Sequence, residues 1–171
     1  VSHLRFGDTP IRSEYLIQEA DYIACHNESF LNSGYNLTEG LKENGIFVLN
    51  TQYGAEQIGS KLPEEMVHSL IGKNARLYLI DAGKLAHSLG LGNRINMIMQ
   101  GAFFHLTGIL PQEKALACLK DSIQAAYGKK GADIVEKNIK AAEYGFRETK
   151  LVPVELLQST REEWENVQEL N

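Results

Sequence analysis

Short apolar runs separated by longer amphipathic segments mark the first half of the chain. The run IFVLN, residues 46–50, has no alternation of apolar and polar positions, which is typical of a strand buried on both faces of a sheet. DYIACH, residues 21–26, and RLYLID, residues 76–81, are further short runs of strand-forming residues. The pattern therefore predicts three strands at these positions.

Between these runs the spacing of apolar residues favours helices. Residues 30–43 have moderate helical character, and Asn44-Gly45 follows them as a left-handed helix terminus would. Pro63 precedes EEMVHSLIG, a second helical segment. We therefore expect one helix over 30–43 and another over 64–72.

Helical periodicity dominates the second half of the chain. INMIMQGAFFHLTGIL, residues 95–110, is the most apolar run, but it is interrupted by polar residues and falls short of the ~20 apolar residues that a membrane span requires. It predicts a buried helix. Two amphipathic helices follow, whose apolar residues recur at helical spacing: Leu116, Leu119, Ile123 and Ala126 in the first, and Val135, Ile139, Ala142 and Phe146 in the second.

This order of elements indicates an α/β fold: a layered domain with a short, largely parallel sheet flanked by helices and a helix-rich C-terminal half. A sheet of three strands is thin, and an opening strand upstream would explain this. We assign residues 1–150 to the domain. Residues 151–171 contain Pro153 and an acidic stretch, which predict an acidic linker or a terminal helix with Ser159 and Glu162 as a capping box.

Composition narrows the classes of function. With 171 residues and 43% apolar content, the chain suits one soluble domain. A formal net charge of −5 argues against nucleic acid as a partner, and no run suggests a membrane contact. Cys25 and Cys118 form no CxxC pair, so the chain alone offers no ligand set for zinc or an iron–sulfur cluster. We expect two free, buried thiols in a reducing cytoplasm.

Three glycine-containing segments match cofactor loops only in part. GLGN, residues 90–93, lacks the third glycine of the dinucleotide fingerprint and follows a predicted helix instead of a strand. Residues 7–8 with Asn36 match the diphosphate–magnesium motif of thiamine enzymes incompletely. GKKG, residues 128–131, is too short for a P-loop. We interpret the first and the third as turns and discard the second as a cofactor motif.

Polar residues in apolar surroundings are candidates for a site. Cys25 and His26 are adjacent on a predicted strand, so their side chains point to opposite faces and cannot pair. Asn138 lies beside the apolar stripe of its helix among small residues, where it can line a helix-packing notch or face a ligand. Asn96 and Gln100 lie four residues apart in the apolar helix, and as buried amides they need hydrogen-bond partners.

The stretch SHLRFGDTPIRS, residues 2–13, sets Arg5 and Arg12 on either side of a turn that begins with Phe6-Gly7. A guanidinium group presents a planar fork of donors that suits phosphates and carboxylates. The stretch is therefore either a solvated loop or a contact for an anionic ligand or a partner surface.

Five stretches together resemble a known family: VSHLRFGDTPIRS, ADYIACHN, GIFVLN, LGLGNRINMIMQGAFFHLTGILP and AYGKKGADIVEKNIKAAEYG. In order and spacing they are similar to the gamma-type domain of pyruvate:ferredoxin (flavodoxin) oxidoreductases, which forms the gamma subunit in multi-subunit 2-oxoacid:acceptor oxidoreductases. The resemblance covers residues 1 to about 150. It implies that the chain is part of a larger enzyme and begins after the glycine-rich opening strand and turn of that domain.

The resemblance also implies the activity of the whole enzyme. Such enzymes decarboxylate pyruvate on thiamine diphosphate with Mg²⁺, pass electrons through 4Fe–4S clusters to ferredoxin or flavodoxin, and form acetyl-CoA with coenzyme A. The thiamine and cluster sites belong to other domains of the family. We therefore expect this chain alone to bind no cofactor and to be inactive, with the remaining domains or subunits of a homodimeric enzyme as its partners.

Within that enzyme the family pattern implies that this domain packs against the thiamine-bearing domains and lines the approach of coenzyme A. The residues expected at that surface are Arg5, Phe6, Gly7, Arg12, Arg94, Asn96 and Asn138. Two alternatives stay open. The domain can be a pure scaffold whose arginines make only inter-domain ion pairs, or a stand-alone nucleotide-binding protein, which the missing glycine loop disfavours.

Overall fold

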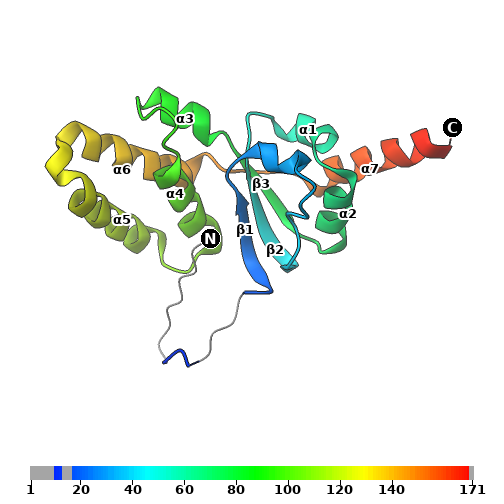
Figure 1. The fold of residues 1–171 in the computed structure, drawn as a ribbon, viewed down its shortest axis with the longest axis horizontal. Helices are drawn as coiled ribbons and strands as arrows, with labels where there is room; N and C mark the ends of the chain where they lie inside the picture. Colours follow the sequence, from blue (N-terminus) through cyan, green and yellow to red (C-terminus); the bar gives the residue numbers. More distant parts are fainter. Residues whose placement is uncertain (1–9, 13–16, 170–171) are drawn as a thin grey trace.

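The structure, a computed structural model, describes residues 10–12 and 17–169, without the side chains at 161 and 163–169. Within these ranges the chain forms one sheet with helices on both faces (Figure 1). The α/β fold with a largely parallel sheet and a helix-rich C-terminal half is therefore confirmed.

Among the described residues the sheet has four strands in the order β1-β2-β3-β4: Ala20–Cys25, Leu41–Asn50, Arg76–Ile80 and Lys150–Leu151. The first two pairings are parallel and the last is antiparallel. The sequence predicts the first three strands but misses β4. A strand of only two residues, both exposed, leaves no hydrophobic period to recognise.

The helix expected over residues 30–43 is wrong. A short 3-10 helix, η1 (Glu28–Asn32), is followed by turns, and β2 already begins at Leu41. Asn44 does adopt the left-handed conformation, with φ of 58°, but inside the strand, where the register with β1 shifts. Asn74 stabilises this bulge by donating to Asn44 Oδ1 at 2.7 Å. Pairing with neighbouring strands thus overrides the weak local helical preference.

The apolar sequence of the central strand β2 follows from its burial on both faces of the sheet. Phe47 and Leu49 belong to the core on one face of the sheet, while Ile46 and Val48 belong to the core on the other. Phe47, Val48 and Leu49 are 0% exposed. A strand covered on both faces has no position for a polar side chain, so the alternation disappears.

Two groups of helices cover the sheet (Figure 1). One face carries α1 (Ala55–Ile58), η2 (Gly59–Lys61), α2 (Glu64–Gly72) and α7 (Val154–Glu169). The other carries α3 (Ala82–Ser88) and α4 (Asn96–Thr107), with α5 (Gln112–Tyr127), η3 (Gly128–Lys130) and α6 (Ala132–Arg147) packed further out. No described helix combines the length and apolar content needed to cross a bilayer.

The C-terminal segment is helical, and it packs on the domain. Leu157 of α7 is buried in the same core as Phe47, and Thr160 lies against Gly59. Because α7 starts at Val154, Ser159 lies inside the helix and donates to the carbonyl of Glu155 at 2.9 Å. The expected capping box at Ser159 and Glu162 is therefore wrong.

Two glycines let α4 and α6 cross with their backbones in contact. A Cβ on Gly145 would overlap the carbonyl oxygen of Ile98 and come within 2.6 Å of the Ala102 nitrogen. A Cβ on Gly101 would overlap the carbonyl oxygen of Ala142. Backbone atoms cannot rotate away as a side chain can, so both positions require the absence of a Cβ.

Substituting Gly145 tests this contact. Gly145→Ala forces the two helices apart, and we expect a loss of about 2–3 kcal/mol in the free energy of unfolding, near the upper end for an overpacked core. In a domain of this size that loss lowers Tm by roughly 5–10 °C, measured by circular dichroism. The control is Gly72→Ala, because a Cβ there meets nothing within 4 Å and Tm should not fall. Equal Tm values for the two variants would contradict the close crossing.

Candidate functional site

A polar crevice lies where the three parallel strands end at their carboxyl ends. It has a volume of about 430 Å³ and receives residues that follow each strand. His26, Asn27 and Glu28 follow β1, and Asn50, Thr51 and Asp81 come from the ends of β2 and β3. In open α/β sheets this edge is where ligands usually bind, because loops and helix N-termini converge there.

Asn50 ties the crevice together. Its side-chain Nδ2 donates to the carbonyl of His26 at 2.9 Å, and its Oδ1 accepts from the backbone nitrogen of Ala82 at 2.9 Å. The first bond holds the end of β1. The second satisfies one of the free N–H groups in the first turn of α3. One amide thus fixes two walls of the crevice relative to each other.

Two carboxylates are held in defined positions in the same crevice. Thr51, which is buried, donates its hydroxyl to Glu28 Oε2 at 2.6 Å. Asp81 accepts from the backbone nitrogen of Lys84 at 2.9 Å and so caps α3. Both acids are already bonded within the protein, so they orient the loops and leave amides and backbone groups to meet a ligand.

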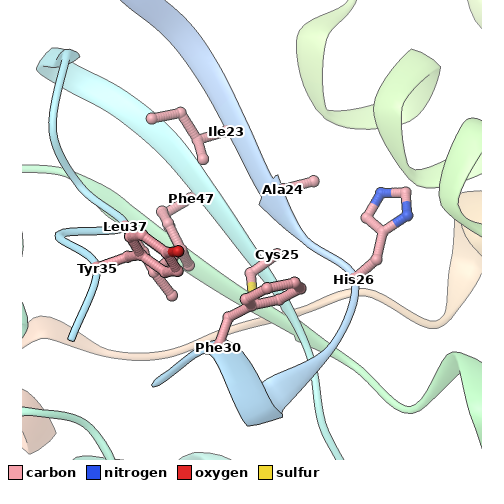
Figure 2. A pocket seen from close by; sticks show the side chains of 8 residues that line it. All are labelled: Ile23, Ala24, Cys25, His26, Phe30, Tyr35, Leu37 and Phe47. Atoms are coloured by element: carbon pink, nitrogen blue, oxygen red, sulfur yellow. The ribbon is translucent and has the colours of Figure 1, made fainter. Parts of the chain in front are cut away.

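His26 and Cys25 diverge from each other. Figure 2 shows the imidazole of His26 pointing to the opposite side of β1 from the thiol of Cys25, as the sequence predicts. Burial lowers the pKa of His26, so the ring favours its neutral form. Burial raises the pKa of Cys25, whose sulfur donates to the carbonyl of Asn27 at 3.1 Å. Cys25 is 7% exposed and belongs to the core on that face of the sheet.

The predicted site residues fall in different places. Arg5, Phe6 and Gly7 lie outside the described residues. Arg12 is exposed, and residues 10–12 lie beyond the amino ends of the strands in Figure 1, away from the crevice. Arg94 is exposed. It lies next to the crevice, because the residues on either side of it in the sequence line the crevice.

Asn96 and Gln100 are exposed on α4, so the expectation that they are buried amides is wrong. The residues that do line the crevice from this segment are Asn93 and Ile95, on either side of Arg94. Asn93 Oδ1 lies 3.2 Å from Nε2 of His87. Asn96 is the first residue of α4, and the first buried residue of this helix is Ile98.

Asn138 is buried on α6, with 5% of its surface exposed. Its Nδ2 donates to the carbonyl of Ile134 in the preceding turn at 2.8 Å. Asn138 does not line the crevice. This geometry favours the helix-packing notch, and the ligand-facing role stays a prediction.

Sequence reasoning missed Asn50, Thr51, Glu28 and Asp81. Asn50 and Asp81 are the last residues of predicted strands, and Thr51 and Glu28 follow shortly after predicted strands; that position was the available signal. Cys118 is exposed on α5, so the expectation of two buried thiols is wrong for this residue. Within residues 10–12 and 17–169 no three His, Cys, Asp or Glu side chains gather in a way that could hold a metal ion.

Comparison with known proteins gives a consistent result. Residues 1–148 match the family model described as "Pyruvate ferredoxin/flavodoxin oxidoreductase". The pyruvate:ferredoxin oxidoreductase of Moorella thermoacetica is 49% identical over 143 residues, which are 84% of this chain and 12% of that protein. A probable pyruvate-flavodoxin oxidoreductase of Escherichia coli is 47% identical over 155 residues, 91% of this chain and 13% of that protein. The chain thus spans about an eighth of the length of these relatives.

A solved structure supports the fold. The crystal structure of pyruvate oxidoreductase subunit PORC from Thermotoga maritima superposes with a TM-score of 0.63. The match covers 80% of this chain and 67% of that subunit, at 24% sequence identity. At this identity the likeness bears on the fold alone.

Removing the Asn50 amide tests the architecture of the crevice. Asn50→Ala leaves the His26 carbonyl and the Ala82 N–H without these partners, so we expect a loss of about 2 kcal/mol in the free energy of unfolding in urea. Asn50→Asp sets a carboxylate oxygen against the His26 carbonyl, in a crevice that already holds Glu28 and Asp81, and should be at least as destabilising as Asn50→Ala. Gln52→Ala, at an exposed neighbour, serves as the control. An Asn50→Ala variant as stable as the control would refute the bridging role.

Proposed function

Because this chain belongs to the pyruvate ferredoxin/flavodoxin oxidoreductase family, we propose that residues 1–150 act as the gamma-type domain of a larger pyruvate:ferredoxin or flavodoxin oxidoreductase. The parent enzyme converts pyruvate and coenzyme A to acetyl-CoA and CO2 and passes the electrons to ferredoxin or flavodoxin. The observation that carries the proposal is the 49% identity to a pyruvate:ferredoxin oxidoreductase over 84% of this chain.

The chemistry of the parent takes place outside the described part of this chain. Thiamine diphosphate with Mg²⁺ supplies the carbanion chemistry and iron–sulfur clusters carry the electrons in the enzyme that we propose. In this proposal both groups are bound by other domains of the parent, as the family resemblance implies. We therefore expect residues 1–171 to be inactive when separated from those domains.

The contribution that we propose for this domain is to line part of the approach of coenzyme A. The crevice at the carboxyl ends of the strands offers the amides of Asn27 and Asn93 to hydrogen-bonding groups of such a ligand. Glu28 and Asp81 make its interior a poor site for phosphate. Phosphates are better placed at the rim, where Arg94 is exposed beside the crevice.

Arg12, together with Arg5, Phe6 and Gly7, is assigned by this proposal to the surface that meets the other domains. Arg12 is exposed, which suits a contact with a partner domain or an anionic group. The partners are the remaining domains or subunits of a homodimeric enzyme. The free cysteines among the described residues are compatible with the cytoplasmic location that we propose.

A purely structural scaffold is the second candidate, and Asn138 is the observation that favours it. Its amide bonds to its own helix, and α6 makes a close backbone contact with α4 through Gly145. Both features serve packing. In this reading the domain holds the parent together and touches no ligand.

Arg94→Ala in the complete oxidoreductase separates the two candidates. Loss of a charge-assisted hydrogen bond to phosphate costs about 1.5 kcal/mol or more, so KM for coenzyme A should rise roughly tenfold with assembly unchanged. Arg76→Ala is the matched control, because Arg76 is an exposed arginine at the amino end of β3. Steady-state kinetics and sedimentation measure the two effects. An unchanged KM, or a loss of assembly, would favour the scaffold.

Asn138→Ala tests the remaining assignment in the same enzyme. If Asn138 faces coenzyme A or the thiamine side, KM for coenzyme A or turnover changes while Tm stays within about 2 °C of the native value. Lys140→Ala, an exposed position on the same helix, is the control. Unchanged KM and turnover would leave Asn138 as a packing residue only.

A further inference from the structure

The last helix, α7, reaches beyond the body of the domain. It has 16 residues, so at 1.5 Å per residue it is about 24 Å long. Figure 1 shows its C-terminal part, in red, extending past α1 and α2 and clear of the other helices and strands. The helix thus has one part that packs on the domain and one part that leads away from it.

The packed part of α7 is held by two contacts. Leu157 is 2% exposed and lies in the core that contains Phe47. Thr160 lies so close to Gly59 that a Cβ on this glycine would overlap the threonine hydroxyl. The helix continues from there to Glu169. The contact with Gly59 therefore fixes the direction in which residues 161–169 leave the domain.

A helical segment of this length gains little stability from its own sequence. Helices shorter than about 12–15 residues are marginal in water unless they pack on something. The last turn of α7 also contains no basic residue, and it ends on Glu169. A carboxylate at the negative end of the helix dipole is unfavourable. Residues 161–169 therefore suit a helix that is stabilised by a partner with positive charge.

The apolar face of α7 continues into this segment. Trp164 and Val167 follow Leu157 by seven and ten residues, which is the spacing of one face of an α-helix. The face that begins in the core at Leu157 thus runs on through positions 164 and 167. Tryptophan is among the residues most enriched at the energetic centre of protein interfaces. The pattern is that of a helix that binds a groove through one face.

The charge of the segment selects the kind of partner. Residues 161–169 contain four glutamates and one arginine, a net charge of −3. Two copies of the segment side by side would bring like charges together, and anionic lipid surfaces would repel it. An apolar groove with lysines and arginines at its rim complements both the apolar face and the acidic flanks.

We propose that residues 161–169 of α7 dock into an apolar groove with a basic rim on another domain of the parent oxidoreductase. The proposal rests on the proposed function for the existence of that parent. The chain spans about an eighth of the length of its relatives, so a parent of that length has further domains that can supply the groove. An amphipathic helix bound in a groove is a common mode of protein recognition.

A photo-crosslink in the complete oxidoreductase identifies the partner. Trp164 is replaced by p-benzoylphenylalanine, the enzyme is irradiated, and the joined peptides are identified by mass spectrometry. We expect a crosslink to a segment of the oxidoreductase outside residues 1–171. The same label at Asn166, which helical spacing places on the opposite face, is the control and should give little of this product. A crosslink only within residues 1–171, no crosslink, or equal yields from the two positions would overturn the proposal.

Hydrogen exchange in the complete enzyme tests whether a partner stabilises the segment. Trp164→Ala removes the apolar anchor, so exchange of the amides of residues 161–169 should rise at least tenfold. Alanine has the higher helix propensity, so a helix held by local preference alone would exchange more slowly in this variant. The amides of β2 serve as the internal reference, because this strand is central in the sheet. Unchanged or slower exchange in the variant would overturn the docking.

Charge reversal in the same enzyme tests for the basic rim. Glu163 borders the apolar face of α7, whereas Glu162 lies on the opposite face by helical spacing. Glu163→Lys should raise exchange of residues 161–169 at least tenfold, and Glu162→Lys should leave it within twofold of the native value. Equal effects of the two variants would overturn the basic rim. None of these experiments reads coenzyme A binding, so a failure here is distinct from a failure of the proposed function.

Discussion

The burial of β2 on every side is the constraint on which the rest of the structure depends. Phe47, Val48 and Leu49 are closed off from solvent, and strands pair with β2 on both edges. Helices must therefore cover both faces of the sheet, and the loops can meet only beyond its ends. Asn50, at the carboxyl end of β2, connects two walls of the crevice. Its amide donates to the carbonyl of His26 after β1 and accepts from the first N–H of α3.

The second organising contact is the crossing of α4 and α6. Gly101 and Gly145 bring the two backbones together, which draws α6 and, through it, α5 toward the sheet. The segment before α4 then lies along the crevice, where Asn93 and Ile95 contribute to its lining. The position of Arg94 at the rim thus depends on a helix contact made farther along α4.

Much of the fold follows from local sequence. The apolar runs of β1, β2 and β3 and the periodicity of the later helices identify these elements, because each pattern reflects burial on known faces. The start of β2 was not predictable in this way. Residues 41–45 are polar enough to resemble a helix end, and only the pairing of β2 with β1 makes them part of a strand.

The site was less accessible to sequence reasoning than the fold. Asn138 was a candidate site residue because it is a polar residue on an apolar face. Its amide, however, donates a hydrogen bond to a carbonyl of its own helix. Asn50 and Thr51 matter more for the crevice, but their role depends on partners that are distant in the chain. The family resemblance rests on the order and spacing of five whole stretches. It therefore holds even where the role expected of a single residue is wrong.

The measurement that tests the central claim most directly is a cryo-electron microscopy structure of the complete oxidoreductase with coenzyme A bound. The account predicts ligand density that contacts the crevice at the carboxyl ends of β1–β3, with a phosphate near Arg94. Coenzyme A held entirely by other domains, with this crevice open to solvent, would contradict it.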